Sequence, residues 1–386
     1  MGRKELGLKD KRIIIVLYAL ELGGAEHQAL LLGRHLFHEE RARVQVVGFV
    51  NPGRAVELCE EYGLPWQLVP MELDLNSKTG ILKAAFQFGW WLRRVHADVI
   101  LPYLTPPNIL CGLTWRWTGA RVCIWNQRNG GIERVEPRLE RWAARLTPWF
   151  VSNSSQGADF LERTLDVDPE RIRIIRNGVE ISKHATDVPA WRTALEVSES
   201  SFLACMVGNL HQGKDHVTLI KAWQQVVKQL TTMNLNAVLL LAGRFDSTDR
   251  SLKQLSEDLG VNEHVRFLGV VKDVAGLLRS VDVGILTSPF NNYEGCPNAV
   301  LEYMASGLAV IGTDIPGIRD VVDVSTHPFL VPIGDVDSLS ERIIQLAVNP
   351  ELRIRLGEAN RQRAVTEFNL QNMCDKTVEF IKECIA

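Results

Sequence analysis

Apolar and polar positions along the chain predict two successive series of strands and helices. Short apolar runs, typical of strands buried on both faces, alternate with stretches in which apolar residues have helical spacing. The first series predicts strands at residues 12–18, 44–49, 99–104, 122–125, 149–152 and 173–175, with the clearest helices at 25–36, 81–94 and 156–164. The second predicts strands at residues 202–207, 237–242, 265–268, 283–286, 309–312 and 329–331, followed by helical sequence from residue 338 to the C-terminus. This alternation predicts an α/β fold, with two Rossmann-like, doubly wound parallel-sheet domains facing a central cleft.

The break between the two series predicts where the domains divide. Residues 177–201 are rich in polar residues, contain Pro189 and lack a clear apolar period. A chain of 386 residues is also longer than one ordinary hydrophobic core requires. We therefore expect an N-terminal domain at residues 1–180, a linker at 181–200 and a C-terminal domain at 201–365. A final helix at 366–386 is expected to pack back on the first domain.

Composition narrows the class of protein but not its chemistry. The formal net charge of -3 and the hydrophobic content of 46% are those of a soluble globular protein. The seven cysteines are scattered and have no C-x-x-C spacing, which argues against a zinc site or a disulfide framework and favours a reducing cytoplasm. The apolar run at residues 13–22 is too short to span a membrane and contains Glu21. We expect a cytoplasmic protein.

Charge and tryptophan concentrate between residues 80 and 150. Ten basic and four acidic residues give this stretch a charge of +6, and it holds seven tryptophans. Basic residues interleaved with tryptophan suit the headgroups of an anionic lipid surface, which would make the protein peripheral on the inner face of a membrane. Equally, the tryptophans can fill a core while the arginines form solvated helix faces, because the stretch lacks a clean amphipathic period.

The segment from Glu294 to Glu302 carries the strongest chemical signal. It reads Glu-Gly-Cys-Pro-Asn-Ala-Val-Leu-Glu, with a helix predicted at residues 298–305. Pro297 suits the first position of that helix, and Gly295 permits a tight backbone path before it. The amides and the dipole of a helix start attract anions. Two carboxylates beside such a start suit a ligand that is part phosphate and part polyol, as a nucleotide sugar is.

Two strand-to-helix turns could hold the same ligand. Gly23-Gly24 follows the first strand and lets backbone amides approach a ligand closely, although it is not the G-x-G-x-x-G of a nicotinamide site, and a plain tight turn explains it as well. Lys214 lies between the first strand of the second series and the next helix, where an ammonium would neutralise a departing diphosphate. The plainer interpretation leaves Lys214 solvated and His216 a surface histidine.

Other strand ends of the second series point to the same edge of the sheet. Gly243-Arg244 ends one strand, residues 265–271 lead into a loop whose backbone at Val270 and Val271 could pair with a base, and Thr287-Ser288 precedes Glu294. Each is unremarkable alone, and their shared position gives them weight.

These residues resemble the retaining glycosyltransferases of family 4, which have the GT-B fold. The resemblance covers nearly the whole chain and rests on Gly23-Gly24-Ala25-Glu26, Val151-Ser152-Asn153-Ser154, Ile175-Arg176-Asn177-Gly178-Val179, the stretch 208–214, Phe267-Leu268-Gly269 and, most strongly, residues 294–314. It implies a metal-independent enzyme without a cofactor. A nucleoside-diphosphate sugar, most often a UDP-sugar, would bind the C-terminal domain, and a glycan or lipid-linked acceptor the N-terminal one. No nucleic acid is expected as a partner.

The resemblance also implies roles for single residues. Glu302 would accept hydrogen bonds from the ribose hydroxyls and Glu294 would contact the donor sugar. Backbone amides around Asn298 and at Gly23-Gly24 would hold the diphosphate, with Lys214 as its cation. The implied catalytic residues are Glu294, Lys214 and Arg128, and the implied donor-binding residues are Gly23, Gly24, Asn209, Lys214, Arg244, Val270, Val271, Glu294, Gly295, Cys296, Pro297, Asn298 and Glu302.

The sequence departs from the family pattern in three places. Asn209 stands where the family commonly has a phosphate-binding arginine, so one of two phosphate cations is either missing or supplied from elsewhere, with Arg244 and Arg319 as candidates. Arg128 stands in a stretch where many members have a histidine, and it could face the donor phosphate or an anionic acceptor. The loop at residues 289–293 is bulkier than usual, and we expect it to reshape the sugar pocket.

Three functions therefore stay open. The first is a retaining glycosyltransferase that builds a surface polysaccharide or glycoconjugate. The second is a nucleotide-sugar epimerase, which generally needs further acidic groups to activate water or move protons. The third is a non-catalytic protein that binds nucleotide sugar, which the asparagine at position 209 raises.

Overall fold

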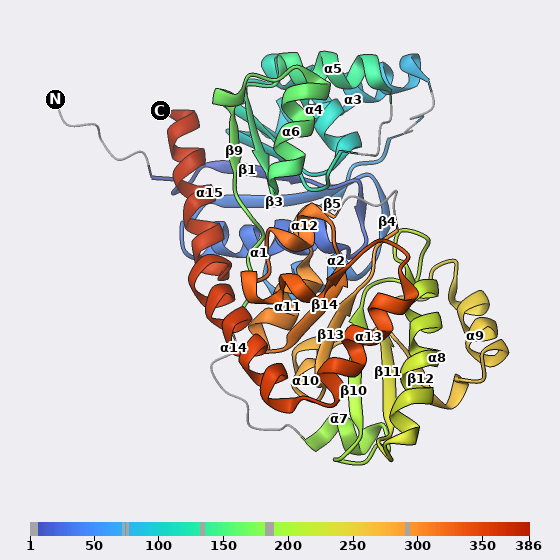
Figure 1. Ribbon diagram of the computed structural model, residues 1–386. Coiled ribbons are helices and arrows are strands. Elements are labelled where there is room, and N and C mark those ends of the chain that lie inside the picture. The colour runs from blue at the N-terminus through green and yellow to red at the C-terminus, as the bar shows by residue number, and fades with distance from the viewer. Residues whose placement is uncertain (1–6, 72–73, 75–76, 132–135, 182–188, 290–293) are drawn as a thin grey trace. The chain divides into compact units, whose positions relative to one another are not determined.

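A computed structural model describes residues 7–71, 74, 77–131, 136–181, 189–289 and 294–386. The chain forms two compact units, Met1–Gly178 with Leu370–Ala386, and Val179–Asn369 (Figure 1). The predicted α/β fold is confirmed, because each unit is built on a parallel sheet with helices around it. The loop expected at residues 289–293 and much of the expected linker fall largely outside the described residues.

The first unit contains a seven-stranded sheet in the order β5-β3-β1-β6-β7-β8-β9, with all neighbours parallel. The strands of this unit are β1 (Arg12–Val16), β2 (Ala19–Leu20), β3 (Arg43–Gly48), β4 (Val50–Pro52), β5 (Trp66–Leu68), β6 (Val99–Pro102), β7 (Val122–Gln127), β8 (Trp149–Ser152) and β9 (Ile172–Ile174). Strands β2 and β4 pair with each other in a separate two-stranded sheet. Its helices are α1 (Gly24–His38), α2 (Arg54–Glu61), α3 (Lys78–Val95), α4 (Thr105–Thr118), α5 (Pro137–Leu146), α6 (Ser155–Leu165), the 3-10 turn η1 (Pro169–Arg171) and α15 (Leu370–Ile385).

Helices cover both faces of this sheet, as a doubly wound fold requires. Alternate residues of β1 point to opposite faces, so Ile13 packs with α1, α2 and α15, whereas Ile14 packs with α3, α4 and α5. Figure 1 shows α15 in red beside the strands of this sheet. The C-terminal helix thus belongs to the first unit, although the helix before it, α14 (Pro350–Glu367), belongs to the second.

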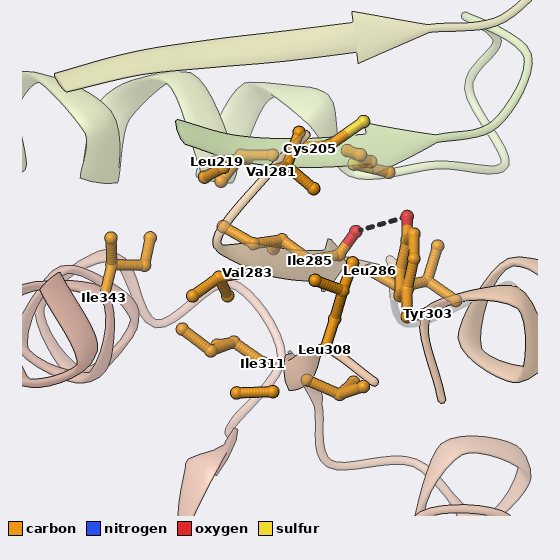
Figure 2. Packing of buried hydrophobic residues seen from close by; sticks show 14 of the residues in the cluster. Cys205, Leu219, Val281, Val283, Ile285, Leu286, Tyr303, Leu308, Ile311 and Ile343 are labelled. Carbon is orange, nitrogen blue, oxygen red and sulfur yellow. Dashed lines mark hydrogen bonds between the residues drawn. The ribbon is translucent and has the colours of Figure 1, made fainter. Parts of the chain in front are cut away.

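The second unit contains a six-stranded parallel sheet in the order β12-β11-β10-β13-β14-β15. Its strands are β10 (Phe202–Val207), β11 (Ala237–Ala242), β12 (Val265–Gly269), β13 (Val283–Leu286), β14 (Ala309–Thr313) and β15 (Leu330–Val331). Its other elements are α7 (Pro189–Ala194), α8 (His216–Thr232), α9 (Asp249–Asp258), η2 (Asn262–His264), α10 (Val274–Arg279), α11 (Asn298–Ala305), α12 (Pro316–Arg319), η3 (Val324–Phe329), α13 (Val336–Ala347) and α14. Figure 2 shows residues of β13 packed in the core of this unit.

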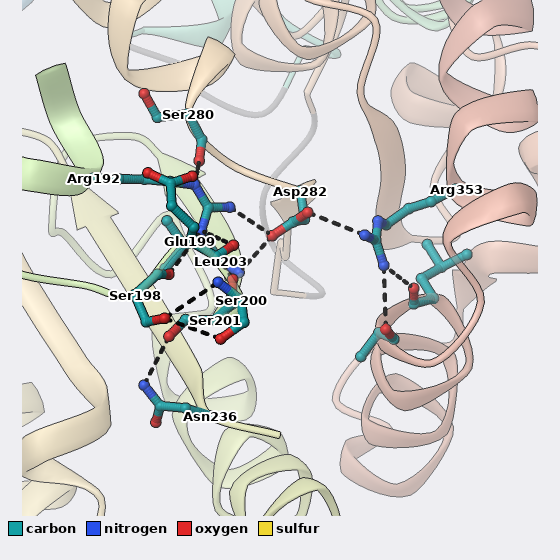
Figure 3. Close-up of polar contacts among 12 residues, drawn as sticks. Arg192, Ser198, Glu199, Ser200, Ser201, Leu203, Asn236, Ser280, Asp282 and Arg353 are labelled. Atoms are coloured by element: carbon teal, nitrogen blue, oxygen red, sulfur yellow. Dashed lines mark hydrogen bonds and ion pairs between the residues drawn. The ribbon is translucent and has the colours of Figure 1, made fainter. Parts of the chain in front are cut away.

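The described part of the expected linker is folded into the second unit. Arg192 of α7 is buried, and its guanidinium donates to Asp282 at 3.1 Å and to the carbonyl of Ser280 at 3.0 Å (Figure 3). Arg353 of α14 donates to the other oxygen of Asp282 at 3.1 Å. A single carboxylate therefore joins α7 and α14 at the amino-terminal end of β13, opposite the edge where the site is expected.

The apolar pattern did not predict three short strands, and Pro297 has a different position at the start of α11 from the predicted one. Strands β2, β4 and β5 have only two or three residues, too few to show a period of two. Pro297 is the N-cap of α11 and not its first residue, because its ψ of 117° is extended. The helix bounds themselves, Asn298–Ala305, are as predicted.

Candidate active site

The carboxyl ends of β10, β11, β12 and β13 bring most of the predicted residues to one edge of the second sheet. Parallel strands end on the same side, so the loops that follow them share that edge. Lys214 lies in the loop after β10, Arg244 after β11 and Val270 after β12. Glu294 and α11 follow β13. The sheet topology thus accounts for the shared position inferred from the sequence.

Lys214 and Glu294 form an ion pair, which the sequence did not predict. The Lys214 ammonium donates to the Glu294 carboxylate, and the two side chains are only 15% and 17% exposed. The Coulomb attraction between two charges that are largely shielded from water is stronger than the attraction between two surface charges, because the effective dielectric constant around them is lower. Lys214 is therefore not the solvated residue of the plainer interpretation. Lys214, the residue expected to bind phosphate, is thus neutralised by Glu294, the residue expected to contact the donor sugar.

Glu302 lies on the second turn of α11 and has an unusual protonation equilibrium. Burial of its carboxylate raises the pKa of Glu302 to about 7. A carboxyl group in this state costs free energy to ionise, and hydroxyl groups that donate to the carboxylate would repay part of that cost. The ribose of a nucleotide presents such hydroxyls.

The start of α11 lacks the side-chain cap that several helices of the second unit have. Helices α8, α10 and α13 begin with an aspartate whose side chain accepts a hydrogen bond from a first-turn amide. Pro297 has no side-chain acceptor, so it cannot satisfy the first turn of α11 in this way. The backbone before the helix is tightly packed, since a Cβ on Gly317 would lie 2.0 Å from the carbonyl oxygen of Glu294. Cys296, in the same turn, is buried.

His211 is a member of the site that sequence reasoning left without a role. Burial and the nearby Lys214 ammonium lower its pKa, and Asp246, Glu294 and Arg244 also act on it. Its Nδ1 accepts a hydrogen bond from the amide of Gly213 at 2.9 Å, so the proton of the neutral ring is on Nε2. One imidazole therefore lies within electrostatic reach of both the Lys214–Glu294 pair and the groups at the end of β11.

The position of Asn209 explains how Arg244 is held. The side-chain oxygen of Asn209 accepts from the amide of Arg244 at 3.2 Å, and Leu210 donates to the Arg244 carbonyl at 2.9 Å. Arg244 pairs with Asp246 at 3.5 Å, and both side chains are more than two-fifths exposed. Arg319, by contrast, donates through two nitrogens to the two oxygens of Asp314. Arg244 is thus the better placed of the two expected substitutes for the family arginine.

His216 is buried and not the surface residue of the plainer interpretation. Burial lowers its pKa to about 4, with Lys214 as the next contribution, so the ring is neutral near pH 7.

Val270, after β12, is 44% exposed and follows Gly269, whose φ of +66° turns the chain out of the strand. Val271 packs against the core of the unit.

Gly23, Gly24 and Arg128 belong to the first unit. Gly23 is the N-cap of α1, and the carboxylate of Glu26 accepts a hydrogen bond from its backbone. Burial raises the pKa of Glu26. A phosphate at this helix start would have to share it with Glu26. Arg128 donates to Asn177 at 2.8 Å, and its guanidinium lies 5.4 Å from the centre of the Tyr103 ring.

Two family models match the chain. The model described as Glycosyltransferase Family 4 matches residues 22–183, and the one described as Glycosyl transferases group 1 matches residues 201–349. No helix among the described residues is long and apolar enough to cross a bilayer.

Curated relatives and solved structures agree with these matches. The UDP-Gal:alpha-D-GlcNAc-diphosphoundecaprenol alpha-1,3-galactosyltransferase of Escherichia coli is 25% identical over 74% of this chain and 75% of its own length. The D-inositol 3-phosphate glycosyltransferase of Saccharomonospora viridis is 26% identical over 61% of this chain and 56% of its own. Anabaena HepE, in complex with UDP and glucose, has a similar fold, with a TM-score of 0.82, 18% identity and coverage of 97% of this chain and 100% of its own.

Proposed function

Because the chain belongs to the group 1 glycosyltransferases of family 4, we propose that it transfers a sugar from a UDP-sugar to a lipid-linked or glycan acceptor with retention of configuration. The observation that carries this proposal is the part-buried Lys214–Glu294 pair, at the same sheet edge as the carboxylate of Glu302. The galactosyltransferase of Escherichia coli is named for a UDP-sugar donor and a diphosphate-lipid acceptor. A related acceptor would place this protein in surface polysaccharide or glycoconjugate synthesis.

Donor binding would exchange the partners of the ion pair. The diphosphate would take the ammonium of Lys214, and Glu294 would turn its carboxylate to the hydroxyls of the donor sugar. Glu302 would accept from the ribose hydroxyls, and the amides around Asn298 would hold phosphate oxygens. The pair then keeps both groups in place before the ligand arrives, which reduces the cost of ordering them on binding.

The chemical step needs a clamp on the leaving group more than a pair of acid and base side chains. The acceptor oxygen would attack the anomeric carbon from the face that the diphosphate leaves. As the bond to the diphosphate breaks, a phosphate oxygen would take the proton of the acceptor hydroxyl. Lys214 and Arg244 would stabilise the negative charge that develops on the diphosphate, a role that a metal ion fills in other transferases. We accordingly propose a metal-independent reaction without a cofactor.

The two other functions are less well supported. The non-catalytic function was raised by the asparagine at position 209, and this asparagine has a structural use of its own, because its side chain holds the backbone amide of Arg244. An epimerase would need further groups to activate water or to move protons. His211 is at hand, but its lowered pKa leaves it a weak base.

A donor panel tests the proposal. The protein is incubated with UDP- and GDP-sugars, with and without EDTA, together with a lipid extract, and release of nucleoside diphosphate is measured. The proposal predicts UDP release that requires acceptor and survives EDTA, and a product whose anomeric proton coupling matches that of the donor. Tight UDP binding without turnover on any donor would favour the non-catalytic function, and release without acceptor would favour the epimerase.

We also propose that the first unit docks on an anionic membrane through α3 and α5. Leu82, Phe86 and Trp90 are spaced four residues apart on α3 and are 41%, 66% and 49% exposed. Such spacing places them on one face of the helix. Exposed basic residues accompany them on the same helix, namely Lys83, Arg93 and Arg94. An apolar row with basic neighbours complements a bilayer with acidic headgroups.

Helix α5 supplies a second part of this surface. Trp142 is 49% exposed and lies between the exposed Arg138, Arg141 and Arg145. Helix α4 packs against both α3 and α5. Trp125, by contrast, is fully buried in the core. The core interpretation therefore holds for Trp125, and the proposed membrane surface uses the exposed Trp90 and Trp142 instead.

Vesicle binding tests this surface. The triple variant Leu82→Ser, Phe86→Ser, Trp90→Ser should lose most of its binding to vesicles containing anionic lipid, and salt should weaken binding of the unaltered protein. Ile354→Ser, which alters an equally exposed apolar residue of the second unit, is the control and should bind as before. Equal binding by the triple variant and the unaltered protein would rule out this face.

A further inference from the structure

The two central strands of the second sheet separate toward the edge that carries the site. Strands β10 and β13 pair at Ala204↔Val283 and Cys205↔Gly284. Beyond that point the side chain of Tyr303, from α11, joins them. Its hydroxyl accepts a hydrogen bond from the amide of Val207 at 2.7 Å and donates to the carbonyl of Ile285 at 3.1 Å. Figure 2 shows the second of these bonds.

The sequence makes room for this side chain at one position. A Cβ on Gly284 would lie 2.3 Å from the ring of Tyr303, so a residue other than glycine would collide with it. Tyr303 is fully buried, and burial raises the pKa of its hydroxyl, which therefore stays protonated and able to donate. If β10 and β13 continued to pair, the amide of Val207 and the carbonyl of Ile285 would have backbone hydrogen-bond partners. The hydroxyl of Tyr303 takes the place of those partners for both groups.

The loop after β10 is tied to β13 at both of its ends. At its start, Val207 is held through Tyr303. At its end, the amide of Asp215 donates to the carbonyl of Thr287 at 3.1 Å, and the hydroxyl of Thr287 donates to the carbonyl of Asp215 at 2.8 Å. Lys214 immediately precedes Asp215, and its ammonium donates a hydrogen bond to Glu294.

We infer that Tyr303 is a positioning residue, whose hydroxyl, together with that of Thr287, fixes the loop that presents Lys214 to the donor diphosphate. The inference rests on the proposed function, because it takes Lys214 as the phosphate cation. Without the hydroxyl, the part-buried amide of Val207 would lose this acceptor, and the start of the loop would move to find another. A displacement of this kind affects an interaction with phosphate more than one with the nucleoside, since electrostatic preorganisation depends on fixed groups.

A double-mutant cycle on UDP and uridine affinity tests the inference. Tyr303→Phe removes the hydroxyl and leaves the ring in place. We expect UDP to bind about tenfold more weakly and uridine to bind as before, because uridine carries no phosphate. In a Lys214→Ala background the same substitution should change UDP affinity by less than about twofold, since coupled residues are not additive. Ile343→Val, which trims a fully buried residue of the same core, is the control for general loosening and should keep normal affinity for both ligands.

The outcomes separate this inference from the proposed function. Unchanged UDP affinity in Tyr303→Phe would overturn the inference, and so would an equal loss of UDP and uridine affinity. An undiminished effect of Tyr303→Phe in the Lys214→Ala background would overturn it as well. Failure of the unaltered protein to bind UDP at all would instead overturn the proposed function. Thr287→Val, which removes the second tie, should reproduce the selective loss for UDP.

Discussion

Replacing Glu302 by glutamine should make the protein more stable at high pH and less able to bind nucleoside. The pKa of Glu302 rises from 4.5 to about 7 because its carboxylate is buried. The folded state therefore holds the proton more tightly than the unfolded chain does. Stability then falls as pH increases between these two values, where the unfolded chain has lost the proton and the folded state keeps it. One pH unit corresponds to about 1.4 kcal/mol, so the full penalty above pH 7 is about 3 kcal/mol.

Urea unfolding of both proteins between pH 4 and pH 8 measures this penalty. Glutamine has no charge to bury. From pH 4 to pH 8, the unfolding free energy of Glu302→Gln should therefore rise by about 3 kcal/mol relative to that of the unaltered protein. The same substitution at Glu341, an exposed residue of α13, is the control, with an effect below about 0.5 kcal/mol. Parallel pH profiles for Glu302→Gln and the unaltered protein would refute a buried carboxylate. In the same series, uridine should bind Glu302→Gln more weakly above pH 7, where only the unaltered protein offers an ionised acceptor.

Three further outcomes follow from the same contacts. Lys214→Ala should lower kcat by about 10²-fold or more in a steady-state assay, as loss of one transition-state donor does elsewhere; a normal kcat would remove Lys214 from the chemistry. Glu302→Ala should mainly weaken donor binding, by about tenfold in a titration, and an effect confined to kcat would contradict a role on the ribose. Asp282→Ala should destabilise the second unit by about 3 kcal/mol or more, because it leaves two largely buried arginines without their carboxylate; Glu383→Ala, which breaks an exposed pair with Arg173, should cost less than about 1 kcal/mol.

The fold could be predicted from the sequence because its strands are buried on both faces. Strands β8, β10, β11 and β13 have the bounds that their apolar runs predict. Helix α11 was equally clear. The elements that the apolar pattern missed were short, or they depended on contacts between residues distant in the sequence. The helix at Pro189–Ala194 belongs to the second unit because Arg192 reaches Asp282, a partner 90 positions away.

The chemistry of the site could be predicted in part. One sequence motif marked Glu294 together with Glu302, and a separate one marked Lys214. Lys214 and Glu294 are 80 positions apart, and they pair because β10 and β13 are neighbouring strands of the sheet. The role of Tyr303 was out of reach for a similar reason, since a tyrosine next to Glu302 in an apolar helix gives the pattern of an ordinary core residue. The one sequence signal of this role is the glycine at position 284, which leaves room for the tyrosine ring. That signal can be recognised only when the pairing of the strands is known.

The most direct test of the account is a crystal structure of the protein with UDP bound. The account predicts that both ribose hydroxyls lie within hydrogen-bond distance of the Glu302 carboxylate. It also predicts that Lys214 has left Glu294 for a phosphate oxygen, with Arg244 on the same diphosphate. UDP bound away from the carboxyl edge of the second sheet, or bound there with the Lys214–Glu294 pair intact, would contradict it.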